Sequence, residues 1–106
     1  MSVPAGVFTL EPAAAGHCVA RGVLTFATAR AARARGLAVL SAAPAGPLEI
    51  DCAGLGVADS AGLAVLLDWL SAARRAGRSL RYAHLPQDLV ALARIGEVDE
   101  LLERGV

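Results

Sequence analysis

Ser60 is the residue of this chain best placed to do chemistry, because it follows Asp59 and opens a strongly apolar segment. A serine at the start of a helix can cap a backbone N–H, carry a phosphate at the positive end of the helix dipole, or act as a nucleophile. The nucleophile of a strand–turn–helix elbow needs the pattern Gly-x-Ser-x-Gly, and here Ala58 replaces the first glycine. The catalytic role therefore lacks its motif, while capping and phosphorylation stay open.

Neither histidine is expected to serve as a base for Ser60. His17 and His84 both fall in predicted strands, and we expect His84 to be a hydrogen-bonded residue at a strand end. Asp68 lies two turns along the same predicted helix as Ser60. A chain of 106 residues also leaves little room for an oxyanion loop and a substrate pocket. We therefore predict no catalytic residues and no enzymatic activity.

The sequence carries no motif for a cofactor, a metal ion or nucleic acid. A Walker-type loop, a dinucleotide fingerprint and a His/Cys cluster are all missing, and the glycines of the segment 54–56 are typical of a turn. Ten basic and ten acidic residues balance, so no net field favours nucleic acid or an anionic membrane. The acidic cluster near residue 100 is expected to be a solvated face; its members are Glu97, Asp99, Glu100 and Glu103.

Composition and cysteine usage predict a cytoplasmic protein without direct membrane insertion. The stretch "MSVPAGVFTLEP" lacks the basic region and apolar run of a secretory signal. The best apolar run, 63–70, is broken by Asp68 and is shorter than the ~20 residues that span a bilayer. Cys18 and Cys52 are isolated, which favours buried free thiols. Hydrophobic residues make up 56% of the chain, so some apolar surface should remain for a partner.

Hydropathy and turn residues predict one α/β domain over residues 1–106, with elements in the order ββαβαβα. The expected strands are Phe8–Glu11, His17–Leu24, Leu48–Cys52 and Ser79–Leu85. The expected helices are Phe26–Ala42 with Thr25 as its cap and a break at Gly36, Ser60–Ala76, and a last helix from Pro86 that is interrupted at Gly96. The segment 54–59 is expected to be a loop. Apolar and acidic residues alternate along Leu48–Cys52, which predicts helices on only one face of the sheet.

The helix that begins at Ser60 is expected to bury one stripe of side chains. Spacings of three and four residues define that stripe as Leu63, Leu66, Leu67, Leu70 and Ala73. The residues Ala61, Ala64 and Val65 fall away from it and are expected to be at least partly exposed. Such a surface of small apolar residues would let another protein approach closely, although a few exposed Ala and Val are also normal. At the other end of this helix, Arg74, Arg75 and Arg78 are expected to favour its negative end; they could also pair with an acidic partner.

A strand with an acidic residue, a loop, and then Asp-Ser-Ala-Gly-Leu at a helix start resemble the STAS domain family. More narrowly, "GVLTFATA", "ADSAGLAVLLDWLSAARRAGR" and "LPQDLVALARIGEVDELL" resemble the MlaB-like STAS subunits of Mla phospholipid ABC transporters. The resemblance covers residues 21–102. It implies a small mixed sheet of about four strands with helices on one face, in agreement with the element order above.

The resemblance also implies a function. The chain would be a non-enzymatic adaptor that binds the ATPase subunit (MlaF-like) of the transporter at the inner membrane and supports the maintenance of outer-membrane lipid asymmetry. Its contact residues would be Asp59, Ser60, Ala61, Gly62, Ala64 and Val65. The alternative is an anti-sigma factor antagonist whose Ser60 is phosphorylated by a partner serine kinase. A phosphate there would add charge to a small apolar contact and weaken it.

Overall fold

The computed structural model describes residues 6–106, built around a four-stranded sheet of order β1-β2-β3-β4. The strands are β1 Phe8–Ala14, β2 His17–Leu24, β3 Leu48–Ala58 and β4 Leu80–Ala83. The helices are α1 Ala29–Ala42, α2 Ser60–Arg75, α3 Gln87–Ile95 and α4 Asp99–Arg104. This confirms the predicted order ββαβαβα, with the last helix in two pieces. The first five residues of the stretch inspected for a secretory signal lie outside the described part. Within 6–106, none of the helices is both long and apolar enough to cross a bilayer.

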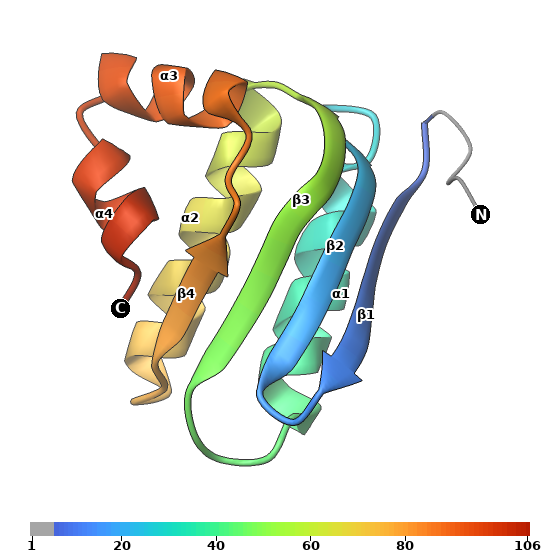
Figure 1. Cartoon of the computed structure of the whole chain (residues 1–106), viewed down its shortest axis with the longest axis vertical. Helices are drawn as coiled ribbons and strands as arrows, with labels where there is room; N and C mark the ends of the chain where they lie inside the picture. Colours follow the sequence, from blue (N-terminus) through green and yellow to red (C-terminus); the bar gives the residue numbers. More distant parts are fainter. Residues whose placement is uncertain (1–5) are drawn as a thin grey trace.

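The sheet is mixed, and one of its faces carries the helices. Strand β1 pairs with β2 antiparallel, whereas β2 with β3 and β3 with β4 are parallel. The two parallel connections step across the sheet in the same direction. Because such crossovers are right-handed, α1 and α2 must lie on the same face, and Figure 1 shows both behind the sheet while α4 flanks β4. The expected fold class is therefore confirmed.

Successive side chains of a strand point in turn to the core and to the open face, the face of the sheet that no helix covers. On β3, Leu48, Ile50 and Cys52 are buried, while Glu49 and Asp51 point to the open face, as the alternating pattern predicts. Both cysteines are buried free thiols, which confirms that prediction. The open face is consequently polar, and its carboxylates pair with histidines.

Two strands are longer than predicted, each for a local reason. Strand β1 continues past Pro12 because it lies at the sheet edge, where a missing N–H costs no ladder hydrogen bond. Strand β3 continues to Ala58, through all but the last residue of the expected loop 54–59. A side chain at Gly54 would press on the side chain of Arg21 and the carbonyl of Ala20. The glycines therefore let β2 and β3 stay close; the prediction of a turn was wrong.

Helix α1 begins later, and strand β4 ends earlier, than the sequence predicts. Helix α1 starts at Ala29 with Thr28 as its N-cap residue, not at Phe26 with Thr25, and it runs through Gly36 without a break. Strand β4 ends at Ala83 because His84 adopts a left-handed backbone conformation with φ of 57°. The His84 ring nitrogen Nδ1 lies 3.0 Å from a carboxylate oxygen of Asp51, which confirms a hydrogen-bonded strand end.

Helix α2 buries a wider arc than the predicted stripe. Four of the five predicted residues are buried, namely Leu63, Leu66, Leu70 and Ala73. Val65 is only 3% exposed and Trp69 is fully buried, whereas Leu67 is half-buried. The indole Nε1 of Trp69 donates a hydrogen bond to the carbonyl of Arg33 on α1. Val65 lies one turn before Trp69 on the same side of the helix. The expected exposure of Val65 was wrong because α2 packs on α1 as well as on the sheet.

Arg78 also differs from its predicted role. Its guanidinium donates hydrogen bonds to the carbonyls of Leu40, Ala43 and Pro44. These carbonyls lie at the end of α1 and in the loop after it, so Arg78 stabilises the end of α1 and not that of α2. Arg74 and Arg75 occupy the last turn of α2 as expected.

Candidate functional site

Ser60 lies at the edge of the sheet where the three parallel strands end. The loops that leave β2, β3 and β4 meet the starts of α1, α2 and α3 at this edge, as Figure 1 shows at the top of the view. In open α/β sheets this carboxyl edge is the usual place for residues that contact ligands. The elements thus gather three separate segments of the chain around the start of α2.

Asp59, and not Ser60, caps helix α2. Its carboxylate oxygen Oδ1 accepts a hydrogen bond of 3.1 Å from the backbone N–H of Gly62. The second oxygen, Oδ2, accepts one of 3.1 Å from the backbone N–H of Phe26, in the loop after β2. These two N–H donors, Phe26 first, hold the pKa of the Asp59 carboxyl below its usual value. Capping therefore leaves the exposed Ser60 hydroxyl for another role.

The six residues proposed from the sequence divide into two layers. Ser60 and Ala64 are exposed, and Asp59 and Ala61 are half-buried. Gly62 and Val65 are buried. A side chain at Gly62 would overlap the backbone carbonyl of Leu24, so glycine lets the first turn of α2 rest on the end of β2. The surface of the site thus consists of Asp59, Ser60, Ala61 and Ala64, while Gly62 and Val65 support it from below.

Phe26 and Val57 extend this surface, and neither was predicted from the sequence. The side chain of Phe26 is 85% exposed and that of Val57 is 60% exposed. Phe26 lies in the loop before α1, and Val57 lies at the end of β3, two residues before Asp59. Recognising Thr28 as the N-cap would have placed Phe26 in a loop outside the helix. Its exposure would then have been open to prediction.

The loop that carries Phe26 is closed by hydrogen bonds. The backbone N–H of Thr25 donates to the Thr28 hydroxyl, and the N–H of Thr28 donates to the carbonyl of Thr25. The Thr28 hydroxyl donates to the carbonyl of Val23, at 2.8 Å. With the bond from Phe26 to Asp59, these contacts fix the backbone on both sides of Phe26. The aromatic ring therefore projects from an ordered loop.

In the part of the chain that the structure describes, both histidines pair with carboxylates of β3 and neither is bonded to Ser60. His17 lies at the start of β2, the opposite end of the sheet, and its ring is 3.7 Å from the carboxylate of Glu49. His84 pairs with Asp51. Among residues 6–106, no three His, Cys, Asp or Glu side chains gather as a metal site would require.

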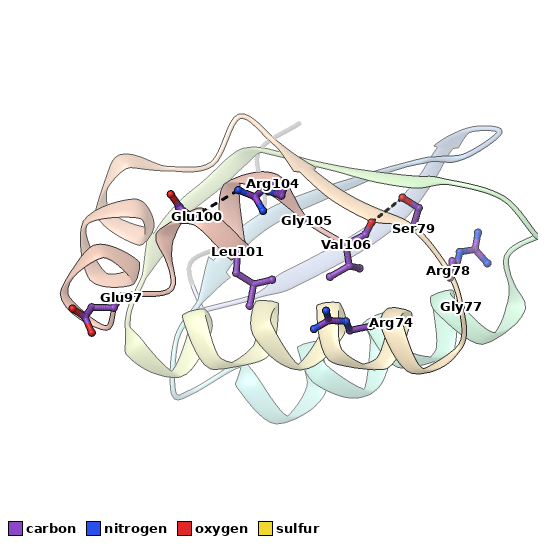
Figure 2. A pocket seen from close by; sticks show the side chains of 10 residues that line it. All are labelled: Arg74, Gly77, Arg78, Ser79, Glu97, Glu100, Leu101, Arg104, Gly105 and Val106. Atoms are coloured by element: carbon purple, nitrogen blue, oxygen red, sulfur yellow. Dashed lines mark hydrogen bonds and ion pairs between the residues drawn. The ribbon is translucent and has the colours of Figure 1, made fainter.

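Two hollows of the molecule lie at the far end of α2 from Ser60. With 16 residues, α2 is about 24 Å long. One hollow of about 650 Å³ lies between the end of α2, α4 and the last residues (Figure 2), and another of about 580 Å³ lies near Cys18 and the loop after α1. In the first, Arg104 points to Glu100 and the Ser79 hydroxyl donates to the Val106 carbonyl. Four polar groups of this hollow thus form two pairs.

Comparisons with known proteins agree with this architecture. The family model described as "Mlab, STAS domain" matches residues 9–103. Among solved structures, the anti-sigma factor antagonist SpoIIAA in its unphosphorylated form is similar, with a TM-score of 0.64 and 17% identity over 85% of this chain and 84% of that chain. A sulfate transporter family protein from Wolinella succinogenes also has a TM-score of 0.64 and 17% identity, over 91% and 77% of the two chains. At this identity the two structures show a shared fold. No curated protein sequence matches the chain.

Proposed function

The chain belongs to the MlaB family of STAS domains, and on this basis we propose that it is a non-enzymatic adaptor that binds the ATPase subunit of a phospholipid ABC transporter. The adaptor would act as one domain over its 106 residues. It would work on the cytoplasmic side of the inner membrane and support assembly or activity of the transporter. No catalytic group, cofactor or metal is needed for this role.

One observation supports a protein partner above all: the backbone of Phe26 is hydrogen-bonded to Asp59 at the start of α2, while Phe26 itself is 85% exposed. Aromatic side chains are enriched at protein interfaces because they bury a large area with few rotatable bonds. Ser60 and Ala64 are small, so the partner can approach the helix closely on one side of the ring. We therefore propose a contact surface formed by Phe26, Val57, Ser60 and Ala64, with Asp59 and Ala61 between them.

Co-purification with the ATPase subunit from the same organism tests the proposal. We expect wild type to bind, and Phe26→Ala to bind at least about tenfold more weakly, because an anchor aromatic at the centre of an interface contributes on the order of 2 kcal/mol or more. Ser60→Glu should also bind weakly, since it places a charge in an apolar contact. The matched control is Ile95→Ala. Ile95 is 82% exposed, close to the value for Phe26, but lies at the far end of α3.

Two outcomes of this experiment would contradict the proposal. If Phe26→Ala and Ile95→Ala bind the ATPase equally well, the proposed surface is wrong. If wild type binds no ABC ATPase, the adaptor function is wrong.

The exposed Ser60 hydroxyl favours one second candidate, an anti-sigma factor antagonist phosphorylated at this residue. The fold shared with SpoIIAA is compatible with it. In that case a serine kinase should bind the wild-type protein and place phosphate on Ser60, detectable by mass spectrometry and lost in Ser60→Ala.

A further inference from the structure

We propose that Asp59 is the positioning residue that joins the Phe26 loop to the start of α2, so that the two segments present one binding surface. This inference rests on the proposed function, since it concerns the same surface. It adds that binding depends on a carboxylate that need not touch the partner. The two segments are separated by 33 residues in the chain and meet through this one side chain.

The two carboxylate oxygens of Asp59 accept hydrogen bonds from two different segments of the chain. Oδ1 accepts from Gly62 and completes the first turn of α2, and Oδ2 accepts from Phe26. An ordinary N-cap needs only the first of these bonds. Ser, Thr or Asn would cap the helix about as well, but each offers a single acceptor oxygen. The second bond is therefore what an aspartate supplies beyond capping.

The remaining contacts of the loop cannot replace this bond. Thr28 ties its own loop to Thr25 and to the end of β2, but neither contact reaches α2. The backbone N–H of Asp59 donates to the carbonyl of Leu24, at 3.3 Å, which fixes β2 and not the loop. Loss of the Oδ2 bond would leave the Phe26 loop tied to the end of β2 and to α1, but no longer bonded to Asp59 at the start of α2. The ring would then sample orientations that the partner must order on binding, at a cost in affinity.

Asp59→Asn separates the two tasks. Asparagine is as good an N-cap as aspartate, so α2 should keep its cap, while its amide nitrogen cannot accept from the Phe26 N–H. The test follows the amide resonance of Phe26 by NMR as the pH is lowered. In wild type the resonance should move as Asp59 takes up a proton, with a midpoint below the usual aspartate value of about 3.9. In Asp59→Asn it should not titrate.

Asp68→Asn is the matched control, because it makes the same chemical change on the exposed side of α2. Asp68 pairs with Arg33, at 3.0 Å, and not with the loop. The control should keep the wild-type titration of Phe26. A Phe26 resonance that titrates in Asp59→Asn as it does in wild type would overturn the proposal. This measurement needs no partner, so it decides the role of Asp59 even if the adaptor function fails.

Binding provides the second readout. Asp59→Asn should weaken co-purification with the ATPase by up to about tenfold, because the partner must then order the Phe26 loop on binding. Because Asp59 acts through Phe26, the double variant Asp59→Asn/Phe26→Ala should bind no more weakly than Phe26→Ala alone. If the two losses add in full, Asp59 contacts the partner directly and the positioning role is wrong.

Discussion

At the scale of single residues, Asp59 and Cys52 show how the environment moves the ionisation of two side chains in opposite senses. Asp59 is half-buried, and the N–H groups of Phe26 and Gly62 stabilise its charged form and lower its pKa. The lowered value means that these bonds are intact at and above about pH 4 and are lost as the pH falls through the pKa of the folded state. Cys52 is buried, and desolvation raises its pKa to about 12. One group is thus charged at neutral pH and the other is neutral.

The two cysteines should be protected from alkylation in the folded protein. Both thiols are buried, and burial raises the pKa of each, so little thiolate is present or accessible. We expect iodoacetamide at mildly alkaline pH to label Cys18 and Cys52 only as fast as the protein opens, measured by mass spectrometry. Labelling in urea is the control and should be rapid. Labelling without denaturant at the rate of a free cysteine would contradict the buried arrangement.

At the scale of elements, glycines decide how closely helices and strands approach. Gly36 on α1 faces the indole of Trp69 on α2, and a Cβ at this position would overlap the ring. Gly62 brings α2 onto the end of β2 in the same way. Helix propensity alone counts Gly36 as destabilising to α1. In the structure, the missing side chain of Gly36 makes room for Trp69 of the neighbouring helix α2.

Gly36→Ala should therefore destabilise the protein although alanine is the better helix former. Overpacking of this kind costs about 1–3 kcal/mol, and we expect the upper part of that range because the Cβ would overlap the Trp69 ring itself. This cost exceeds the gain in helix propensity, about 1 kcal/mol, so the free energy of unfolding should fall. Chemical denaturation followed by circular dichroism measures the difference. Gly56→Ala is the control, because the nearest atom to its Cβ would be 3.9 Å away, an ordinary contact. A more stable Gly36→Ala protein would show that α1 and α2 have space between them.

At the scale of the whole molecule, Trp69 connects three elements of the core. Its ring is fully buried on α2, contacts the Gly36 side of α1, and lies 6.1 Å from the ring of Phe8 on β1. Its indole N–H is paired with the carbonyl of Arg33, so no buried donor is left unsatisfied there. The packing of both helices on the sheet depends on this one side chain.

Trp69→Ala should accordingly lower the free energy of unfolding by about 3–5 kcal/mol, as for other large buried aromatics. That is a large part of the 5–15 kcal/mol typical of a folded domain. Urea denaturation followed by circular dichroism gives the value, with Ile95→Ala as an exposed control that should change stability by less than about 0.5 kcal/mol. A loss below about 1 kcal/mol for Trp69→Ala would mean that the core closes without the indole.

The sequence by itself determined the features that depend on local pattern. Alternating polarity on Leu48–Cys52 was enough to predict a sheet with one covered face, and the spacing of turn residues predicted the order of elements. The phrase around Asp59 and Ser60 located the start of α2 and the centre of the candidate site. Each of these features arises from residues within a few positions of one another.

The tertiary structure decided which surfaces are exposed and which side chains cooperate. Val65 is buried because α1 packs beside it, and Trp69 reaches a carbonyl 36 residues away. Asp59 joins Phe26 across 33 residues, and this contact makes an exposed aromatic part of the site. A local sequence pattern cannot predict such pairings. Burial and hydrogen bonding between elements depend on how the crossovers place those elements relative to one another. The start of α2 and its exposed small residues were visible in the sequence, but the burial of Val65 and the exposed Phe26 nearby were not.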